Sequence, residues 1–299
     1  MYSILITGGT GLVGKHLGLL LQSKGYHVNI LSRKHSEKTN VFYWNVNKNH
    51  IDAEAITNID YIIHLAGAGI ANKRWSKLRK KELIDSRVKT TNLLYQKVRE
   101  LNPHLKGFIA ASGIGYYGAT TSSKIFTEKD ENGDDFLSLI CKLWEKASTK
   151  FNTLTIRTII FRTGIVFSKN DGALQKIKKP LKLGFGSPIG SGNQFMPWIH
   201  IDDLCNMYIE AIENPKLNGI YNAVAPEHIT NTFLTLELAK ILKKKIWLPN
   251  IPSLVFKILF GEMSIILLKG SRVCSDKISK TEFNFRFPNL KSALLNLSK

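Results

Sequence analysis

Short apolar runs alternate with amphipathic segments along the first half of the chain. The apolar runs predict strands at residues 4–6, 27–32, 41–44, 60–67, 107–113 and 154–162. Helical spacing of apolar residues follows the first run, spans about 74–101 and returns at about 136–150. Strands separated by helices predict right-handed βαβ units, and therefore a parallel sheet covered on both faces.

The pattern loosens after Asn170. Glycines at 184, 186, 190 and 192 mark a long loop, PWIHIDDL opens another helix, and helices follow near 232–243 and 253–268. We therefore predict an α/β fold with a doubly wound parallel sheet in residues 1–170. Residues 171–299 are expected to form a smaller substrate lobe interwoven with this core, including a C-terminal helical domain from about 248.

A glycine-rich stretch, ILITGGTGLVG, joins the first strand to the first helix. Its glycines fit the turn that lets backbone N–H groups approach a pyrophosphate at a helix N-terminus. An ordinary tight turn is the alternative, but the strand before it and the helix after it favour a dinucleotide site. The contacts expected from this stretch are Gly8, Thr10, Gly11, Leu12, Val13 and Gly14.

The end of the second strand distinguishes between the two nicotinamide dinucleotides. NAD sites usually place an acid here for the ribose 2′-hydroxyl, whereas this chain has Ser32 and Arg33 and no acid before Glu37. A guanidinium suits the 2′-phosphate of NADP, so we predict NADP; NAD, with Arg33 a plain surface charge, is the alternative. Further cofactor contacts are expected at two other strand ends, from Leu65, Ala66 and Gly67 and from Arg162, Gly164 and Ile165.

The fifth predicted strand ends in residues that can carry chemistry. Ser112 precedes GIGYYG, and a hydroxyl at this strand end can hydrogen-bond a substrate oxygen in the cleft. Tyr116 and Tyr117 each offer a phenol, either as a proton donor or as a wall against the nicotinamide. A structural turn with packed tyrosines is the alternative.

Composition places the chain among globular proteins, with 299 residues of which 43% are hydrophobic. Cys141, Cys205 and Cys274 lie far apart, which excludes a disulfide framework and a cysteine zinc cluster and favours a reducing, cytoplasmic setting. Lys15 and His16 interrupt the first apolar residues, so these are expected to form a strand rather than a signal peptide.

The formal net charge of +19 is large, but the lysines are spread along the chain and no nucleic-acid motif accompanies them. We expect a small-molecule substrate, favoured if anionic, and no nucleic-acid partner. Lys257 and Glu262 interrupt the longest apolar stretch, residues 251–270. No membrane partner is therefore expected, although an interfacial helix is an alternative. The chain is expected to be a monomer or a homodimer.

Several motifs together resemble the extended short-chain dehydrogenase/reductase superfamily, in its NAD(P)-dependent epimerase/dehydratase group. These are GGTGLVG, the LAG after the fourth strand, the serine after the fifth, and WIHIDDL. The strings RWSKLRKKELIDSRVKTTNLL, SGIGYYG and GSGNQFMPWIHIDDL are similar to its atypical "epimerase family protein" subgroup, which carries a short C-terminal domain of unknown function. The resemblance covers essentially the whole chain and implies a Rossmann core with a smaller substrate lobe.

One departure from the superfamily concerns its proton relay. Active members use Tyr-x-x-x-Lys on the helix after the fifth strand, but these positions fall on about Leu137 and Cys141 here. Lys142 is adjacent, yet a shift of one residue turns it about 100° around a helix. We therefore expect Tyr116 or Tyr117 to replace the missing acid, with Ser112 polarising the substrate.

The resemblance also suggests residues that meet the substrate. Arg87 falls near a position where extended members keep a structural asparagine, so it is expected to face the cleft and an anionic substrate. His200 lies in the string that closes the substrate lobe, where Asp202 or Asp203 is expected to cap a helix. No second histidine stands at ligand spacing, so no metal is expected.

Two hypotheses follow. The first is an NADP-dependent oxidoreductase or epimerase-like enzyme that transfers hydride on a small, anionic carbonyl or sugar-like substrate. The second is an NADP-binding sensor or scaffold without chemistry of its own. The missing Tyr-x-x-x-Lys favours the second, and the retained loop from Ser112 to Tyr117 favours the first.

Overall fold

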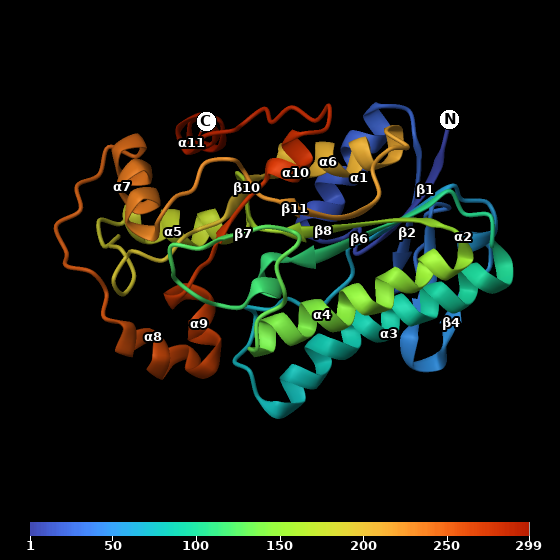
Figure 1. The fold of residues 1–299 in the computed structure, drawn as a ribbon, viewed down its shortest axis with the longest axis horizontal. Helices are drawn as coiled ribbons and strands as arrows, with labels where there is room; N and C mark the ends of the chain where they lie inside the picture. Colours follow the sequence, from blue (N-terminus) through green and yellow to red (C-terminus); the bar gives the residue numbers. More distant parts are fainter. Residues whose placement is uncertain (299) are drawn as a thin grey trace.

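The computed structural model describes residues 1–298, which are built around a central eight-stranded sheet (Figure 1). The strands follow the order β11-β8-β6-β5-β1-β2-β3-β4. Their bounds are β1 Ser3–Thr7, β2 His27–Ser32, β3 Val41–Asn45, β4 His50–Ile51, β5 Tyr61–His64, β6 Gly107–Gly113, β8 Arg157–Thr163 and β11 Gly219–Ala223. All neighbouring pairs are parallel except β3 and β4. Because β2 and β5 flank β1 on opposite sides, the chain opens a crevice at the carboxyl end of β1.

Helices cover both faces of the sheet. In Figure 1, α1 (Leu12–Ser23) and α6 (Ile201–Glu213) lie above it, and α3 (Lys77–Leu101) and α4 (Phe136–Ser148) lie below. Apolar residues that alternate along each strand point into two separate cores, with Ile4 and Ile6 in one and Leu5 in the other. The short helix α2 (Glu54–Thr57) joins the second core through Ala55 and Ile56. These layers confirm the predicted Rossmann sheet.

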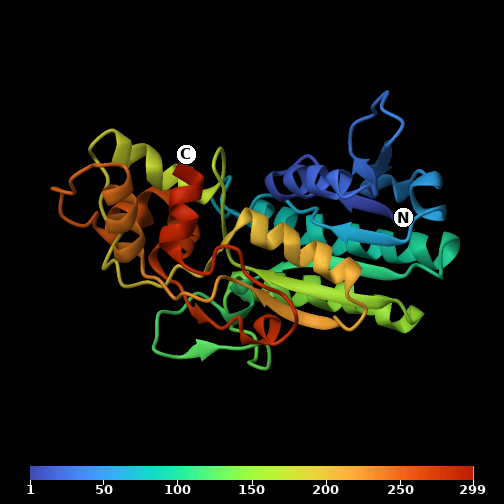
Figure 2. The same cartoon turned by 90° about the horizontal axis from the view of Figure 1, so that it is seen from above.

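A smaller lobe lies beyond the carboxyl ends of the strands (Figure 2). Its core gathers α5 (Ala173–Lys182), α7 (Asn231–Ile241) and α11 (Leu290–Ser298) around the stacked rings of Phe167 and Trp198. Two strand pairs connect it to the sheet: β9 (Ile165–Phe167) with β10 (Trp198–His200), and β7 (Ile125–Phe126) with β12 (Arg272–Val273).

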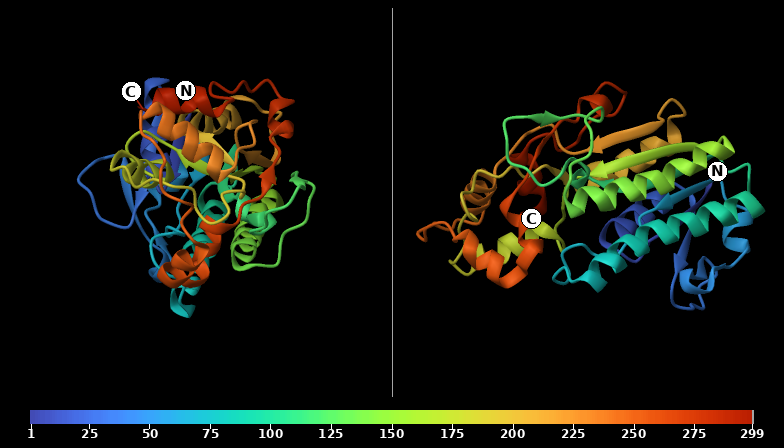
Figure 3. Two further views of the ribbon diagram at one scale, coloured as in Figure 1. Left: turned by 90° about the vertical axis from the view of Figure 1, so that its left-hand side faces the viewer. Right: turned by 60° about the horizontal axis from the view of Figure 1, so that its bottom comes forward.

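Two short helices complete this lobe, α8 (Ser253–Phe260) and α9 (Ile265–Leu268), whereas α10 (Asp276–Ser279) packs through Ile278 in the core that α6 and β11 share. Figure 3 shows α8 and α9 beside the ends of α3 and α4. Met263, between α8 and α9, packs there with Trp75, Leu83 and Ile140. Apolar side chains therefore join the C-terminal helices directly to the core domain.

The structure corrects several predicted bounds. The helix expected over 253–268 is interrupted, because Gly261 has a φ of +58° and separates α8 from the turn before α9. The strand expected from 154 begins at Arg157, after Thr155 adopts a left-handed conformation. The strand β4 was not predicted.

Two elements assigned to the second lobe belong to the core. Helix α6 packs in the same core as α1, and β11 extends the sheet next to β8. The expected division at residue 170 is therefore wrong for residues 201–223, because the chain first enters the smaller lobe and then returns to the sheet as α6 and β11. Within the described residues, no helix is both long enough and apolar enough to cross a membrane.

Candidate functional site

The glycine-rich turn between β1 and α1 is closed by backbone contacts. Gly8 has a φ of +73°, and a Cβ there would lie 2.9 Å from the carbonyl carbon of Leu65. A Cβ on Gly14 would lie 2.3 Å from the carbonyl oxygen of Gly8, so the first turn of α1 can approach β1 only with glycine. Gly11 is the N-cap residue and offers no side chain, which leaves the helix N-terminus able to bind an anion.

The other residues predicted in this turn take different positions. Thr10 is exposed, whereas Leu12 and Val13 are half-buried and pack against the core between α1 and the sheet. Their backbone N–H groups lie in the first turn of the helix, where no side chain caps them. A phosphate would therefore meet backbone donors here rather than charged side chains.

Basic residues surround the end of β2. The Ser32 hydroxyl accepts the backbone N–H of Lys34 at 3.0 Å, and Arg33 is exposed. Glu82 on α3 faces the same region, where a hydrogen bond from Arg79 and, more weakly, the charge of Arg33 lower the pKa of its carboxyl group. Arg33 forms no ion pair within residues 1–298, so its guanidinium is available to a ligand.

A buried histidine fixes the turn after β5. The Nδ1 of His64 lies 2.7 Å from the Thr7 hydroxyl, and its Nε2 lies 3.0 Å from the Thr91 hydroxyl. Burial, with a smaller effect from the charge of Arg87, lowers the pKa of His64 to about 3, so the ring is neutral. Thr7 also accepts the N–H of Ala66 at 3.2 Å, which holds the segment Leu65–Gly67 against the glycine-rich turn.

Arg87 reaches this same turn from α3. A Cβ on Gly67 would lie 3.1 Å from the Arg87 Cζ, and the guanidinium lies over the Trp144 ring at 5.1 Å. Its Nη1 donates to the Leu83 carbonyl at 2.9 Å. No carboxylate in the described part of the chain pairs with Arg87, and burial, aided by the charge of Arg79, lowers its pKa. A half-buried cation beside Gly67, unpaired within residues 1–298, has affinity for an anion.

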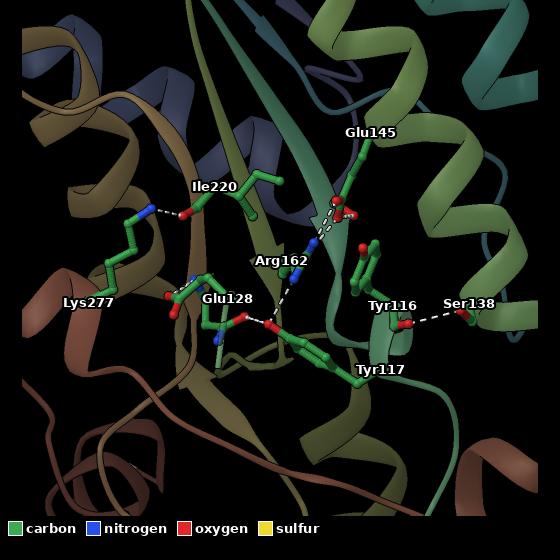
Figure 4. Close-up of polar contacts among 10 residues, drawn as sticks. Tyr116, Tyr117, Glu128, Ser138, Glu145, Arg162, Ile220 and Lys277 are labelled. Carbon is green, nitrogen blue, oxygen red and sulfur yellow. Dashed lines mark hydrogen bonds and ion pairs between the residues drawn. The ribbon is translucent and has the colours of Figure 1, made fainter. Parts of the chain in front are cut away.

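The end of β6 forms a buried network with α4 and β8 (Figure 4). Glu145 accepts hydrogen bonds from Arg162 Nε and Nη2, both at 2.9 Å, and from the Ser112 hydroxyl at 2.7 Å. Burial alone would lower the pKa of Arg162, but the hydrogen bonds and charge of Glu145 outweigh it and raise that pKa. The Ser112 hydroxyl therefore donates its hydrogen bond to Glu145 and offers a substrate only its lone pairs.

The two tyrosines of the loop differ in their surroundings. Tyr117 is buried; its hydroxyl donates to Asn222 at 2.6 Å and accepts from Arg162 Nη1 at 3.0 Å. Burial raises its pKa to about 12. Tyr116 is half-exposed, its ring face lies 3.3 Å from the Arg162 Cζ, and its phenol has no hydrogen bond to residues 1–298 (Figure 4). Only Tyr116 has a phenol free to meet a substrate.

The positions of the missing Tyr-x-x-x-Lys pair face this loop. A Cβ on Gly115 would lie 3.1 Å from the Leu137 Cβ, so Leu137 touches the residue next to Tyr116. Cys141 is buried one turn further along α4, and burial, with the charge of Glu145, raises its pKa to about 11. Neither Leu137 nor the thiol of Cys141 can supply the proton relay.

His200 occupies a structural position. It is the N-cap of α6, where its Nδ1 accepts the N–H of Asp202 at 3.1 Å, and its Nε2 lies 3.2 Å from the Asn296 Oδ1. The prediction that Asp202 or Asp203 caps this helix is therefore wrong. Asp203 instead accepts the N–H groups of Arg286 and Phe287, which ties the C-terminal segment to α6. Burial lowers the pKa of His200, and its surroundings give it no open donor for a substrate.

The residues predicted after β8 separate into two groups. Arg162 belongs to the buried network, whereas Gly164 and Ile165 lead into the second lobe. The Gly164 N–H donates to the Ala223 carbonyl at 3.0 Å, and the Ile165 N–H donates to Pro197 at 2.7 Å. A Cβ on Gly164 would lie 2.5 Å from the Pro197 carbonyl oxygen, so close backbone packing explains this glycine.

Sequence reasoning missed two residues of the network, Glu145 and Asn222. Glu145 lies on the apolar face of α4, and a carboxylate on a buried helix face was a signal for a buried partner. Asn222 lies within the short strand β11 and gives no comparable signal. Residues 1–298 contain no cluster of three His, Cys, Asp or Glu side chains able to hold a metal.

Comparison with known proteins identifies the family of this chain. Residues 4–223 match the NAD dependent epimerase/dehydratase family, and residues 251–297 match a domain of unknown function, DUF1731. Human epimerase family protein SDR39U1 is 33% identical over 295 residues, which cover 97% of this chain and 98% of the human protein. The chain belongs to the NAD dependent epimerase/dehydratase family. The resemblance drawn from the motifs, including the C-terminal domain, is confirmed.

Further similar proteins match all or nearly all of this chain. An epimerase family protein from Staphylococcus aureus is 35% identical over 304 residues, which cover 100% of both chains. The crystal structure of human SDR39U1 with NADPH has a TM-score of 0.90 and 32% identity, with 99% of each chain covered. A nucleoside-diphosphate sugar epimerase from Corynebacterium glutamicum has a TM-score of 0.81 and 29% identity, covering 98% of this chain and 57% of that one.

Proposed function

We propose that this protein binds NADP and transfers hydride to or from a small, anionic carbonyl or sugar-like substrate. The bound nicotinamide would supply or accept the hydride. The glycine-rich turn, with two positions that exclude a Cβ, fits a pyrophosphate at the N-terminus of α1. Arg33 and the absence of an acid at the end of β2 fit a 2′-phosphate. NADPH in the structure of human SDR39U1 supports the same choice.

Tyr116 is the residue that we propose to donate or accept the substrate proton at its Oη. It stands beside Leu137, on the turn that covers the usual tyrosine position. The Arg162 guanidinium lies 3.3 Å from the centre of its ring, and this cation–π contact positions the side chain. The free phenol of Tyr116, next to the buried Ser112–Glu145–Arg162 network, is the observation that carries this proposal.

The remaining residues position the reaction. Ser112 accepts a hydrogen bond from a substrate hydroxyl, since its own proton goes to Glu145. Arg87, which lacks a carboxylate partner, binds the anionic group of the substrate beside Gly67. Tyr117 holds the loop in place through Arg162 and Asn222 and does not titrate.

Two measurements test this function. Fluorescence titration should give tighter binding of NADPH than of NADH, and a turnover screen with anionic carbonyl and nucleotide-sugar substrates should find oxidation or reduction of the cofactor. Tyr116→Phe should then lower kcat by about 100-fold or more, with little change in cofactor affinity. Tyr117→Phe, the matched control, should lose stability and keep most of its turnover. Full activity of Tyr116→Phe would refute the role of Tyr116.

A second function, an NADP-binding sensor or scaffold, is favoured by Leu137 and Cys141 at the positions of the proton relay. Tight NADPH binding without turnover of any substrate in the screen would support it over the enzyme. Under either function we keep the predictions of a small-molecule ligand, of a cytoplasmic location, and of a monomer or homodimer.

A further inference from the structure

Helix α8 turns an apolar side toward solvent. None of its eight residues is buried. Leu254 and Ile258 are 63% and 66% exposed, and Val255 and Leu259 are exposed beside them. At 100° per residue these four side chains span about 140° of the helix surface, while the half-buried Phe256 and Phe260 stack on the opposite side. The helix therefore presents apolar residues both inward and outward, unlike an ordinary surface helix.

A second exposed apolar segment is connected to α8 through the loop that precedes this helix. Leu183 and Phe185 are exposed at the turn after α5, and the Trp247 indole donates to the Gly184 carbonyl between them at 2.9 Å. The loop from Trp247 to α8 is held against the segment that follows Phe185, because the Ile251 N–H donates to the Pro188 carbonyl at 2.9 Å. We call Leu183, Phe185, Trp247, Leu254, Val255, Ile258 and Leu259 the apolar face.

Lysines without carboxylate partners surround the apolar face. Residues 172–201 and 238–261, which contain all of its members, hold no Asp or Glu. Apart from Lys240, which pairs with Glu237, the exposed lysines in these two segments are Lys176, Lys179, Lys182, Lys243, Lys244, Lys245 and Lys257. None of these seven forms an ion pair within residues 1–298. Burial lowers the pKa of Lys178, and the charges of Lys182 and Lys169 lower it further.

We propose that the apolar face docks on the surface of an anionic lipid bilayer, with α8 and Trp247 in the headgroup region and the lysines on lipid phosphates. Exposed aliphatic and aromatic residues bordered by lysines match this interface, into which such elements enter by about 5–10 Å. A nucleic acid would leave Leu254 and Ile258 in water. A second copy would bring lysine-rich surfaces together on a chain of net charge +19.

A cavity beside α8 is separate from the proposed active site. It measures about 740 Å³ and is lined by Ser253, Lys257, Ile265 and Leu268 among others. Neither Ser112 nor Tyr116 lines it, so docking through α8 leaves the proposed active site unobstructed. In Figure 1, α8 lies at the far end of the second lobe, with α9 between it and α4. The proposal is independent of the proposed function.

Trp247 provides an internal reporter for the test. It is 68% exposed, whereas Trp44, Trp75, Trp144 and Trp198 are buried. Full-length protein is mixed with vesicles of phosphatidylcholine alone or with phosphatidylglycerol, and sedimentation and tryptophan emission are measured. We expect co-sedimentation and a blue shift only with the anionic vesicles, both weakened by added salt. Trp247→Phe should remove the blue shift and retain most of the binding.

Matched variants separate the apolar from the charged contribution. Leu254→Ser with Ile258→Ser should weaken binding by roughly tenfold or more. Leu19→Ser with Leu78→Ser, which changes two leucines that are 70% and 79% exposed elsewhere, should not. A triple variant with Lys243→Gln, Lys244→Gln and Lys245→Gln should bind roughly 100-fold more weakly. The control triple variant carries Lys38→Gln, Lys48→Gln and Lys146→Gln, at exposed lysines outside the apolar face, and should lose much less binding.

Three results would overturn the proposal. One is no binding to anionic vesicles, or binding that the serine variants and their control share equally. Another is a dimer in solution without lipid in which Trp247 emission is already blue-shifted, since a second copy would then cover the face. The third is a blue shift produced by RNA and not by vesicles.

Discussion

Replacing Glu145 by glutamine tests the buried network most directly. The change keeps the size of the side chain but removes the charge that faces Arg162, and it turns an amide toward one of the two guanidinium donors at 2.9 Å. Arg162 is 2% exposed, so water cannot replace the lost acceptor. The Arg162 guanidinium should stay charged without Glu145, because arginine keeps its proton in proteins even without an acidic partner.

The expected loss follows from these contacts. Each hydrogen bond to a charged partner contributes about 1.5–3 kcal/mol, and removing one partner of a buried ion pair costs about 3–5 kcal/mol. At roughly 2 °C per kcal/mol for a chain of this length, Glu145→Gln should lower Tm by about 6–10 °C. Thermal unfolding followed by circular dichroism, without cofactor, measures this shift.

Two variants serve as controls. Lys240→Gln breaks a pair with Glu237 in which the lysine is exposed, and it should change the free energy of unfolding by less than about 0.5 kcal/mol. Glu145→Leu with Arg162→Met removes both charges and should be closer to the parent protein than Glu145→Gln is. The reasoning is refuted if Glu145→Gln is as stable as Lys240→Gln, or if the double variant is the less stable of the two.

Three further predictions concern the cofactor turn, the 2′-phosphate and pH. Gly14→Ala should abolish NADPH binding in a fluorescence titration, because its Cβ would lie 2.3 Å from the Gly8 carbonyl oxygen, whereas Gly18→Ala on the same helix, with 4.0 Å of clearance, should bind normally. Arg33→Ala should weaken NADPH binding by about 10–100-fold and leave NADH binding unchanged; equal losses would contradict the assignment. The native pKa of His64, about 3, lies below its ordinary 6.5. Unfolded chains therefore bind an extra proton between these values, and stability should fall as pH drops from 6.5 toward 3, by up to about 1.4 kcal/mol per unit. His64→Gln should flatten this limb in urea unfolding, and an unchanged slope would show that other groups cause it.

The sequence by itself determined the sheet, the glycine-rich turn and the family. Apolar periodicity is local, and β6 begins and ends at the predicted residues, Gly107 and Gly113. The roles of the glycines could be predicted because each position in the motif requires close backbone packing. The structure agrees at Gly8 and Gly14, where a Cβ would collide with backbone atoms. Arg33 likewise depends only on its place at the end of β2.

Only the tertiary structure decided which polar groups are free. Tyr116 and Tyr117 are adjacent in sequence, yet Asn222 and Arg162, from distant strands, occupy the hydroxyl of Tyr117 alone. Both ring nitrogens of His200 are occupied, because Nδ1 accepts the Asp202 N–H at the start of α6 and Nε2 contacts Asn296 on α11. Hydrogen-bond partners and exposure come from segments far apart in the chain, and the pattern of neighbouring residues carries no record of them.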